Sequence, residues 1–306
     1  ENLLYGRGTT DCLGHVALLT DFLHTLGKTQ PQLERTIIVV FIANEEDSSR
    51  QGVGIDALHK AGHLDQLKNG PVYWIDAADT QPCVGTAGVV QWSLKSVGRL
   101  FHSGLPHRGI NSIELLMEAL SVIQKRFYED HPPHENEKKW NYMISSTMKP
   151  TQIECARGSL NQIPPNATVS GDIRLIPFYS MKEVMARVES YVEDLNNSVT
   201  DLPQRGPASK YEVKDEGMKG KLELTWLSEG EDGIACRLDS EGNKVIQEAT
   251  KEVLGDVTPF ALSGSLPLVR NLQDSGFDIQ MVGYGLSTRY HADNECVDIN
   301  DMKKAI

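Results

Sequence analysis

Cysteine is scarce in this sequence, with five residues in 306, an odd number that includes no CxxC pair. This pattern predicts reduced thiols in a cytosol-like compartment rather than a disulfide framework. Long apolar runs are also missing, since none approaches the roughly 20 residues of a membrane span. We therefore expect no membrane partner.

Positive charge is in deficit as well. The chain carries 30 lysines and arginines against 42 acidic residues, for a net charge of -12. This balance argues against nucleic acid and anionic membranes as partners, whereas a cationic small substrate is compatible with it. The content of 40% hydrophobic and 24% charged residues is typical of a soluble globular protein. The length predicts one or two domains.

The two ends of the chain have the pattern of an α/β domain. Continuously apolar, β-branched segments predict strands that are covered on both faces of a sheet, as at residues 36–43. The other predicted strands are 72–75 and 277–282. Helices are expected at 11–27, capped by Gly27, and at 242–254, with Val245, Ile246, Ala249 and Val253 facing inward. We predict a helix-flanked mixed sheet built from residues 1–88 and 231–306.

The middle of the chain predicts a smaller α+β domain inserted at residues 89–230. Strands are expected at 88–98, 147–156, 168–176 and 221–226. Helices are expected at 113–127, with Leu116, Leu120 and Ile123 on one face, and at 180–195, opened by a capping box of Ser180 and Glu183. The order is strand-helix-strand-strand-helix-strand, the split βαβ pattern.

Four candidate site residues follow strand-like or turn-rich stretches. Asp11 lies in GRGTTDCLG, Glu45 and Glu46 in NEEDS, and His291 in STRYHADNE. Carboxylates and an imidazole gathered from distant segments suit a hard or borderline divalent metal, and a spare glutamate supplies a general base. Each residue also has an ordinary explanation: a helix N-cap for Asp11, a solvated turn for the glutamates, and a loop histidine without function.

A further carboxylate ligand is expected at the end of the strand at 72–75. Asp76 directly ends that strand, and Asp79 follows three residues later. Either could bind a metal, and a surface turn explains them equally well.

The segments GRGTTDCLG, NEE, FHSGLPHRGINSIE, NQIPPNATVSGDIRLIP and HADNE, in this order, resemble the dinuclear zinc amidohydrolases and exopeptidases. The resemblance extends over nearly the whole chain. It implies two Zn²⁺ ions per subunit, with Co²⁺ as a substitute, an N-acyl amino acid as the substrate, and a homodimer formed through the inserted lid or dimerisation domain. The implied reaction is zinc-dependent hydrolysis of N2-acetyl-L-ornithine to L-ornithine and acetate, in arginine and ornithine biosynthesis. Two alternatives stay open: another N-acyl-amino-acid amidohydrolase or dipeptidase of the family, and a non-catalytic, metal-poor binding protein.

The resemblance also implies a role for each acidic residue and for His291. Asp11 would bridge the two metals, Glu46 and His291 would complete the second metal's ligands, and Glu45 would be the general base. Asp76 would bind the first metal. Relatives carry the glutamate of a GEPT motif there, where this sequence has DAADT, and Asp76 is preferred to Asp79 because it ends the strand.

The inserted domain contributes the remaining implied residues. His102 would polarise the scissile carbonyl, in many relatives from the partner subunit. Arg174 and Asn161 would hold the carboxylate and backbone of the substrate, and the planar guanidinium of arginine suits a carboxylate.

Two departures from the family pattern stand out. The bridging aspartate is followed by Cys12-Leu13-Gly14 instead of Met-Lys-Gly, a change that we expect to affect packing. The histidine of the family's upstream HxD motif does not occur before Asp11, so we expect the sequence to be a piece of a longer protein. No secretion signal is visible, and a cytoplasmic or plastid location is expected.

Overall fold

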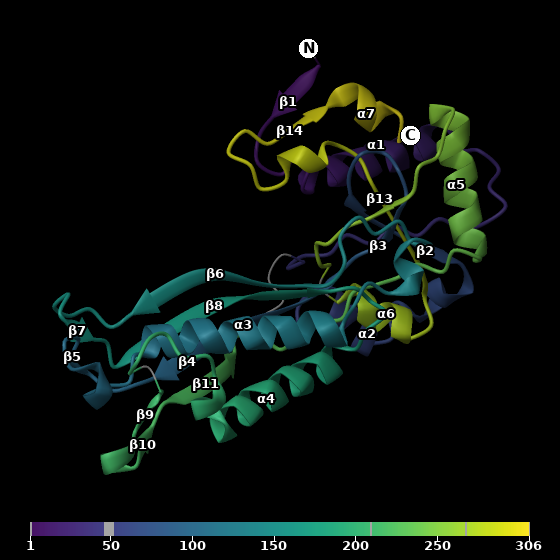
Figure 1. The fold of residues 1–306 in the computed structure, drawn as a ribbon. Coiled ribbons are helices and arrows are strands. Elements are labelled where there is room, and N and C mark those ends of the chain that lie inside the picture. Colours follow the sequence, from purple (N-terminus) through teal and green to yellow (C-terminus); the bar gives the residue numbers. More distant parts are fainter. Residues whose placement is uncertain (1, 46–51, 209, 267, 306) are drawn as a thin grey trace.

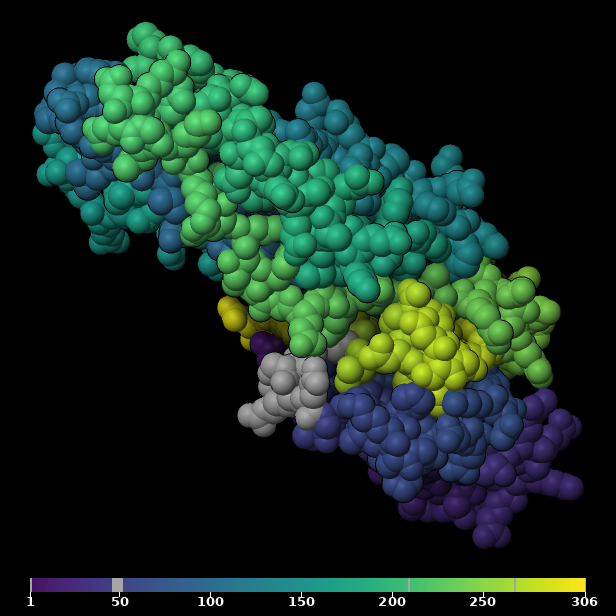
Figure 2. Space-filling model, turned by 90° about the horizontal axis from the view of Figure 1, so that it is seen from below, coloured from purple at the N-terminus to yellow at the C-terminus, as the bar shows by residue number. Residues whose placement is uncertain are grey.

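The protein was analysed as a computed structural model, which describes residues 2–45, 52–208, 210–266 and 268–305. Its shape is elongated (Figure 1). The middle of the chain forms a domain that projects from the domain made by the two ends, and Figure 2 shows the same division from below.

The inserted domain has the predicted split βαβ order. Its sheet has the strand order β11-β4-β8-β6, and all neighbouring strands are antiparallel. The structure confirms the predicted strands and helices here to within a few residues. The elements are β4 (Gly88–Val97), α3 (Ser112–Asp130), β6 (Thr147–Cys155), β8 (Asn166–Leu175), α4 (Met181–Asn197) and β11 (Lys221–Trp226).

One face of this sheet is the main core of the inserted domain. In β4 the side chains of Val90, Trp92 and Leu94 are buried, while Gln91 and Lys95, which point to the opposite face, are exposed. Helices α3 and α4 pack on the buried face and contact each other. Fully burying one large apolar side chain contributes about 1.5–3 kcal/mol, so this face fixes how the strands align.

The predicted capping box at the start of α4 is wrong. Ser180 is the N-cap residue, but its side chain makes no capping hydrogen bond. The backbone N–H of Met181 instead donates to Oδ1 of Asp232 at 2.8 Å. A carboxylate from a distant segment thus replaces the local cap, an outcome that local sequence does not reveal.

The end domain contains a mixed sheet, as predicted. Its strand order is β12-β3-β13-β2, with β13 parallel to β2 and antiparallel to β3. The strands are β2 (Pro71–Ala77), β3 (Cys83–Gly85), β12 (Phe260–Ala261) and β13 (Asp278–Gly283). A second small sheet pairs β1 (Leu3–Tyr5) with β14 (Cys296–Asp298) and so joins the two ends of the chain. The helices of this domain are α1 (Leu13–Thr29), α2 (Ile55–Lys60), α5 (Glu241–Leu254), α6 (Val269–Asp274) and α7 (Ile299–Lys303).

The predicted strand at residues 36–43 is wrong, since these residues form neither helix nor strand. Ile37, Ile38, Val40 and Phe41 are between 38% and 49% exposed. A strand requires a neighbour that pairs with its backbone N–H and C=O groups. Among the described residues no strand pairs with this segment. Its apolar, β-branched composition therefore favours a strand, but the segment has no neighbouring strand with which to pair among the described residues.

Two helices of the end domain differ in detail from the prediction. Helix α1 continues past Gly27 to Thr29 and ends at Gln30 in the left-handed conformation. Helix α5 faces the sheet through its first turn, where Gly242 and Asn243 are buried. Val245 and Val253, predicted to face inward, are 48% and 57% exposed.

The orientation of α5 has a structural cause. Nδ2 of Asn243 donates to Oε1 of Gln280 on β13 at 3.0 Å. A Cβ on Gly242 would lie 2.5 Å from Cβ of Pro71, so the helix approaches the sheet closely at this glycine. Buried polar pairing at the first turn, rather than the apolar stripe, fixes the helix.

The chain crosses between the two domains twice, at neighbouring positions. β-bridges join Gly85 to Ala235 and Val89 to Glu231. The predicted limits of the inserted domain, 89 and 230, lie at this double crossing. Among the described helices, none has the length and apolar composition needed to cross a bilayer.

Candidate metal centre

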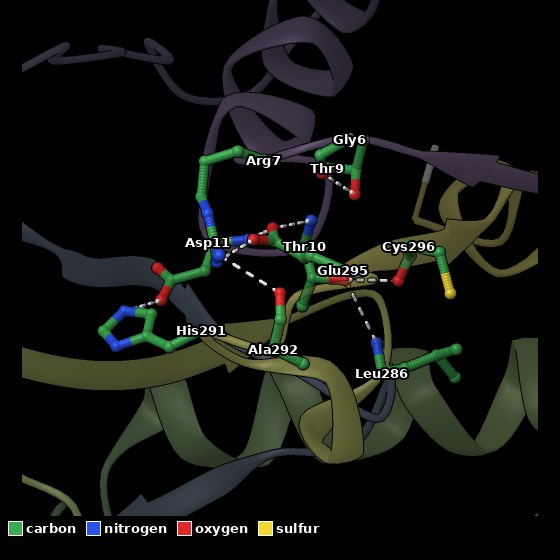
Figure 3. A network of polar contacts seen from close by, with 10 residues as sticks. All are labelled: Gly6, Arg7, Thr9, Thr10, Asp11, Leu286, His291, Ala292, Glu295 and Cys296. Atoms are coloured by element: carbon green, nitrogen blue, oxygen red, sulfur yellow. Dashed lines mark hydrogen bonds and ion pairs between the residues drawn. The ribbon is translucent and has the colours of Figure 1, made fainter.

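A tight loop before α1 presents Asp11 (Figure 3). The backbone N–H of Gly14 donates to the carbonyl of Gly8 at 2.9 Å and closes the loop. A Cβ at Gly14 would lie 2.1 Å from the carbonyl oxygen of Thr9, so only glycine fits there. The hydroxyl of Thr10 donates to the carbonyl of Cys296 at 2.9 Å. The loop is thus fixed to the far end of the chain, next to β14.

Glu295, which the sequence analysis did not single out, holds this loop. Its Oε1 accepts from the backbone N–H groups of Thr10 and Asp11 at 3.0 and 3.1 Å. Its Oε2 accepts from Nη1 of Arg7 at 2.7 Å, and the Glu295 side chain is 1% exposed. Glu295 ends the HADNE segment. The sequence pattern of that segment indicates His291 as a candidate ligand. A buried carboxylate that orders a distant loop has no recognisable local sequence pattern.

The protonation of Glu295 follows from its partners. Burial raises the pKa of its carboxyl. The hydrogen bonds from the backbone of Asp11, Thr10 and Gly8, together with the charge of Arg7, outweigh that effect and hold the pKa below its ordinary value. Glu295 is therefore a stable anion, which suits a structural acceptor.

Asp11, Cys12 and Asp76 come together at the mouth of α1. One oxygen of each carboxylate and Sγ of Cys12 all lie within 4.8 Å of one another. Nε2 of His291 lies 2.9 Å from Oδ2 of Asp11, with side-chain exposures of 69% and 15%. The structure thus brings together three of the four predicted metal ligands from three distant segments. Glu46, the fourth, lies outside the described residues.

Glu45 lies near this group. Burial, followed by the negative charges of Asp76, Asp11 and Glu45, raises the pKa of the Cys12 thiol to about 12. The charge of Glu45 therefore reaches Cys12, although Glu45 does not belong to the group formed by Asp11, Cys12 and Asp76.

The geometry distinguishes Asp76 from Asp79. Asp76 lies on β2 and belongs to the cluster. Asp79 is exposed, has φ 64°, and accepts the backbone N–H of Ser287 at Oδ1, at 3.0 Å. Asp79 therefore has a turn-forming contact of its own, and the arrangement favours Asp76 as the ligand.

Tyr290 is a second residue that the sequence analysis missed. Its hydroxyl is buried and has no hydrogen-bond partner among the described residues. Burial, followed by the charges of Asp76, Asp11 and Asp79, raises the pKa of Tyr290. The phenol is therefore neutral and acts as a potential donor toward the acidic cluster.

The three predicted residues of the inserted domain lie in two places. His102, on β5 (Phe101–His102), pairs with Gln162 of β7 (Gln162–Ile163), and the carbonyl of Asn161 accepts the backbone N–H of Ser103 at 2.8 Å. Strands β5 and β7 lie at the outer end of the inserted domain, far from α1, β1 and β14 (Figure 1). His102 and Asn161 are thus neighbours, but the structure does not bring them to Asp11 of the same chain.

Arg174 lies at the other end of β8. Its Nε donates to Oδ2 of Asp172 at 2.9 Å. Arg174 lies eight positions after Asn166, the first residue of the strand, which corresponds to roughly 27 Å along β8. Arg174 is therefore near the domain junction, and Asn161 is near the tip.

The chemistry of the cluster fits a divalent metal. Carboxylate oxygens, an imidazole nitrogen and a thiol are the donor types that Zn²⁺ and Co²⁺ accept. Three of the groups, Asp11, Cys12 and Asp76, are acidic or thiol side chains gathered at one point, an arrangement that a cation stabilises. His291 and Asp11 already share a contact, so little rearrangement is needed for both to bind one ion.

Comparison with known proteins agrees with this geometry. A model of the peptidase dimerisation domain matches residues 84–200. The chain is 54% identical over 299 residues to acetylornithine deacetylase of Arabidopsis thaliana, covering 98% of this chain and 68% of that protein. It is 52% identical over 307 residues to acetylornithine deacetylase of Dictyostelium discoideum, covering 99% of this chain and 69% of that protein. The chain belongs to the acetylornithine deacetylase family.

The fold is also similar to that of solved structures with much lower sequence identity. The crystal structure of human carnosine dipeptidase 1 superposes with a TM-score of 0.66 at 16% identity, covering 100% of this chain and 71% of that one. At this identity the likeness concerns the fold alone. Family membership makes the chain a metal-dependent amidohydrolase and explains a catalytic domain with an inserted dimerisation domain.

Proposed function

We propose that the protein hydrolyses N2-acetyl-L-ornithine to L-ornithine and acetate, as a step of ornithine and arginine biosynthesis. The observation that carries this proposal is the identity of 52–54% to two acetylornithine deacetylases over nearly the whole chain. The gathering of Asp11, Asp76 and His291 supports it, because the reaction needs a metal site. The net charge of -12 is compatible with a substrate that carries an ammonium side chain.

The proposed cofactor is a pair of Zn²⁺ ions per subunit, which Co²⁺ can replace. Asp11 would bridge the ions, Asp76 would hold the first, and His291 with Glu46 would hold the second. When bound, the metal would act as a Lewis acid on the amide carbonyl and would lower the pKa of water toward about 7.

Glu45 is the proposed general base, which would transfer a proton from water to the leaving amine. It would accept a proton from the attacking water as the water oxygen bonds to the acetyl carbon. It would then return that proton to the amine nitrogen as the carbon–nitrogen bond breaks. The products are acetate and ornithine with its α-amine as an ammonium. That nitrogen gains one water proton through Glu45 and takes up the second as the acetic acid ionises, so atoms and charge balance without a further reactant.

Arg174 and Asn161 would hold the substrate. The guanidinium of Arg174 uses Nε to bond Asp172, and this contact fixes the plane in which the terminal nitrogens meet a carboxylate. His102 would donate to the oxyanion at the site of the partner subunit. Its place at the far tip, away from Asp11 of its own chain (Figure 1), supports a homodimer through the inserted domain.

A substrate panel tests the proposal. We expect kcat/KM for N2-acetyl-L-ornithine to exceed that for succinyl-diaminopimelate, acetyl-methionine and carnosine by at least about 10-fold, since a site that pairs a charged substrate group rejects analogues lacking it. A different preferred compound would assign the protein to another amidohydrolase activity. Metal bound without turnover of any compound would favour the binding-protein alternative.

A further inference from the structure

Cys12 occupies an unusual place for a cysteine of this chain. Cys83 and Cys236 are buried in the apolar core of the end domain, and Cys155 is exposed on β6. Cys12 is half-buried between two carboxylates, with Sγ within 4.8 Å of an oxygen of Asp11 and of Asp76. Apolar packing does not explain a thiol in such surroundings.

The spacing is that of donors around one ion. With zinc–sulfur and zinc–oxygen bonds of about 2.3 and 2.0 Å, neighbouring donors of a tetrahedral site lie about 3.5 Å apart. The three donor atoms of Asp11, Cys12 and Asp76 lie within 4.8 Å of one another. A small side-chain rotation would bring them to the spacing of a tetrahedral site. Cys12 also directly follows Asp11 in the loop whose backbone Glu295 holds at Thr10 and Asp11.

We propose that Cys12 is a sulfur ligand of the divalent metal held by Asp11 and Asp76. This inference rests on the metal site of the proposed function. On binding, the metal ion would displace the thiol proton of Cys12 to solvent. The sulfur ligand would shift the preference of the site toward softer ions, so that Zn²⁺, Co²⁺ and Cd²⁺ bind in preference to Mn²⁺.

Optical spectroscopy of the cobalt-substituted protein tests the proposal. Thiolate ligation gives an intense near-ultraviolet charge-transfer band that carboxylate and imidazole ligands do not give. We expect this band in the unchanged protein and in the control Cys155→Ser, and its loss in Cys12→Ser. Weaker visible cobalt bands and the cobalt content should persist in Cys12→Ser, because Asp11, Asp76 and His291 remain.

X-ray absorption of the zinc-loaded, unchanged protein gives an answer that needs no variant. A sulfur scatterer at about 2.3 Å from zinc supports the proposal, whereas a shell of oxygen and nitrogen alone overturns it. Acetylornithine hydrolysis is measured on the same samples. Turnover without a sulfur signal contradicts the cysteine ligand and leaves the proposed function intact. Protein that binds neither cobalt nor zinc and lacks turnover contradicts both.

Discussion

The Oε1 atom of Glu295 accepts a hydrogen bond from the backbone N–H of Asp11 at 3.1 Å, across 284 positions of sequence. The buried Glu295 carboxylate also binds the backbone of Thr10 and the guanidinium of Arg7. Figure 3 shows these contacts around the loop that carries Asp11. The far end of the chain therefore sets the position of Asp11, the proposed bridging ligand, and His291 lies in the same far segment.

Replacing Glu295 with glutamine should loosen this loop. The amide would turn a donor toward Arg7 in a buried place, so we expect the free energy of unfolding to fall by about 1–3 kcal/mol. Metal affinity should fall about 10–100-fold, as for other residues that orient ligands. Denaturant unfolding and metal titration measure the two effects.

The matched control is Glu252→Gln on the exposed surface of α5. It should change neither quantity appreciably, because exposed substitutions fall within about 0.5 kcal/mol. Equal behaviour of the two variants would remove Glu295 from its positioning role.

The contribution of Glu295 should depend on pH. Its pKa is lower in the folded protein than in the unfolded chain, where glutamate titrates near 4.3. The stabilisation is therefore fully present above the unfolded pKa and is lost as pH falls through the folded pKa. The difference in unfolding free energy between the wild type and Glu295→Gln should be constant near neutral pH and narrow below about pH 4. A difference that widens in acid would contradict this assignment.

Asp76 and Asp79 form a natural pair for testing the metal ligands. Asp76→Asn should lower metal affinity more than the 10–100-fold typical of residues that only orient a ligand. Asp79→Asn should retain the metal, because Asp79 bonds the backbone of Ser287. Metal content after dialysis against a weak chelator is the readout, and the reverse result would exchange the two assignments.

Glu45→Gln should bind metal normally but hydrolyse N2-acetyl-L-ornithine about 100- to 10,000-fold more slowly, the usual contribution of a general base. The charge of Glu45 contributes to the raised pKa of Cys12, which directly follows Asp11 in the chain. Steady-state kinetics with parallel metal analysis separates loss of the base from loss of the ion. Turnover close to that of the wild type would exclude Glu45 as the base.

The separation of His102 from Asp11 can be tested by mixing subunits. His102→Ala and Glu45→Gln should each form inactive dimers. Random exchange of subunits in a two-fold dimer should restore about a quarter of the wild-type sites, because a hybrid contains one site with both residues intact. No recovery after demonstrated exchange would mean that His102 serves its own chain or has no part in the reaction.

The sequence predicted the inserted domain well because its signals are local. Alternation along β4 and the apolar stripe of α3 each follow from one buried face. The same reasoning failed where distant groups decide. Asp232 caps α4 in place of the Ser180 side chain, and Asn243 fixes the orientation of α5.

In the candidate site, too, residues with a local sequence signal were predicted and residues that depend on distant contacts were missed. Asp11, Asp76 and His291 were found from their positions after turns and strands and from the family resemblance, and the structure brings them together. Glu295 and Tyr290 were missed because their significance arises from burial beside residues far away in the chain. The segment 36–43 was predicted as a strand from composition, but strand formation depends on a partner that composition does not supply.

The most direct test of the central claim is ornithine release from N2-acetyl-L-ornithine by the purified protein, before and after removal of metal by a chelator. We predict turnover that is lost with the metal and restored by Zn²⁺ or Co²⁺, with one ornithine formed per acetate. Turnover that survives complete removal of metal, or no ornithine release from the metal-loaded protein, would contradict it.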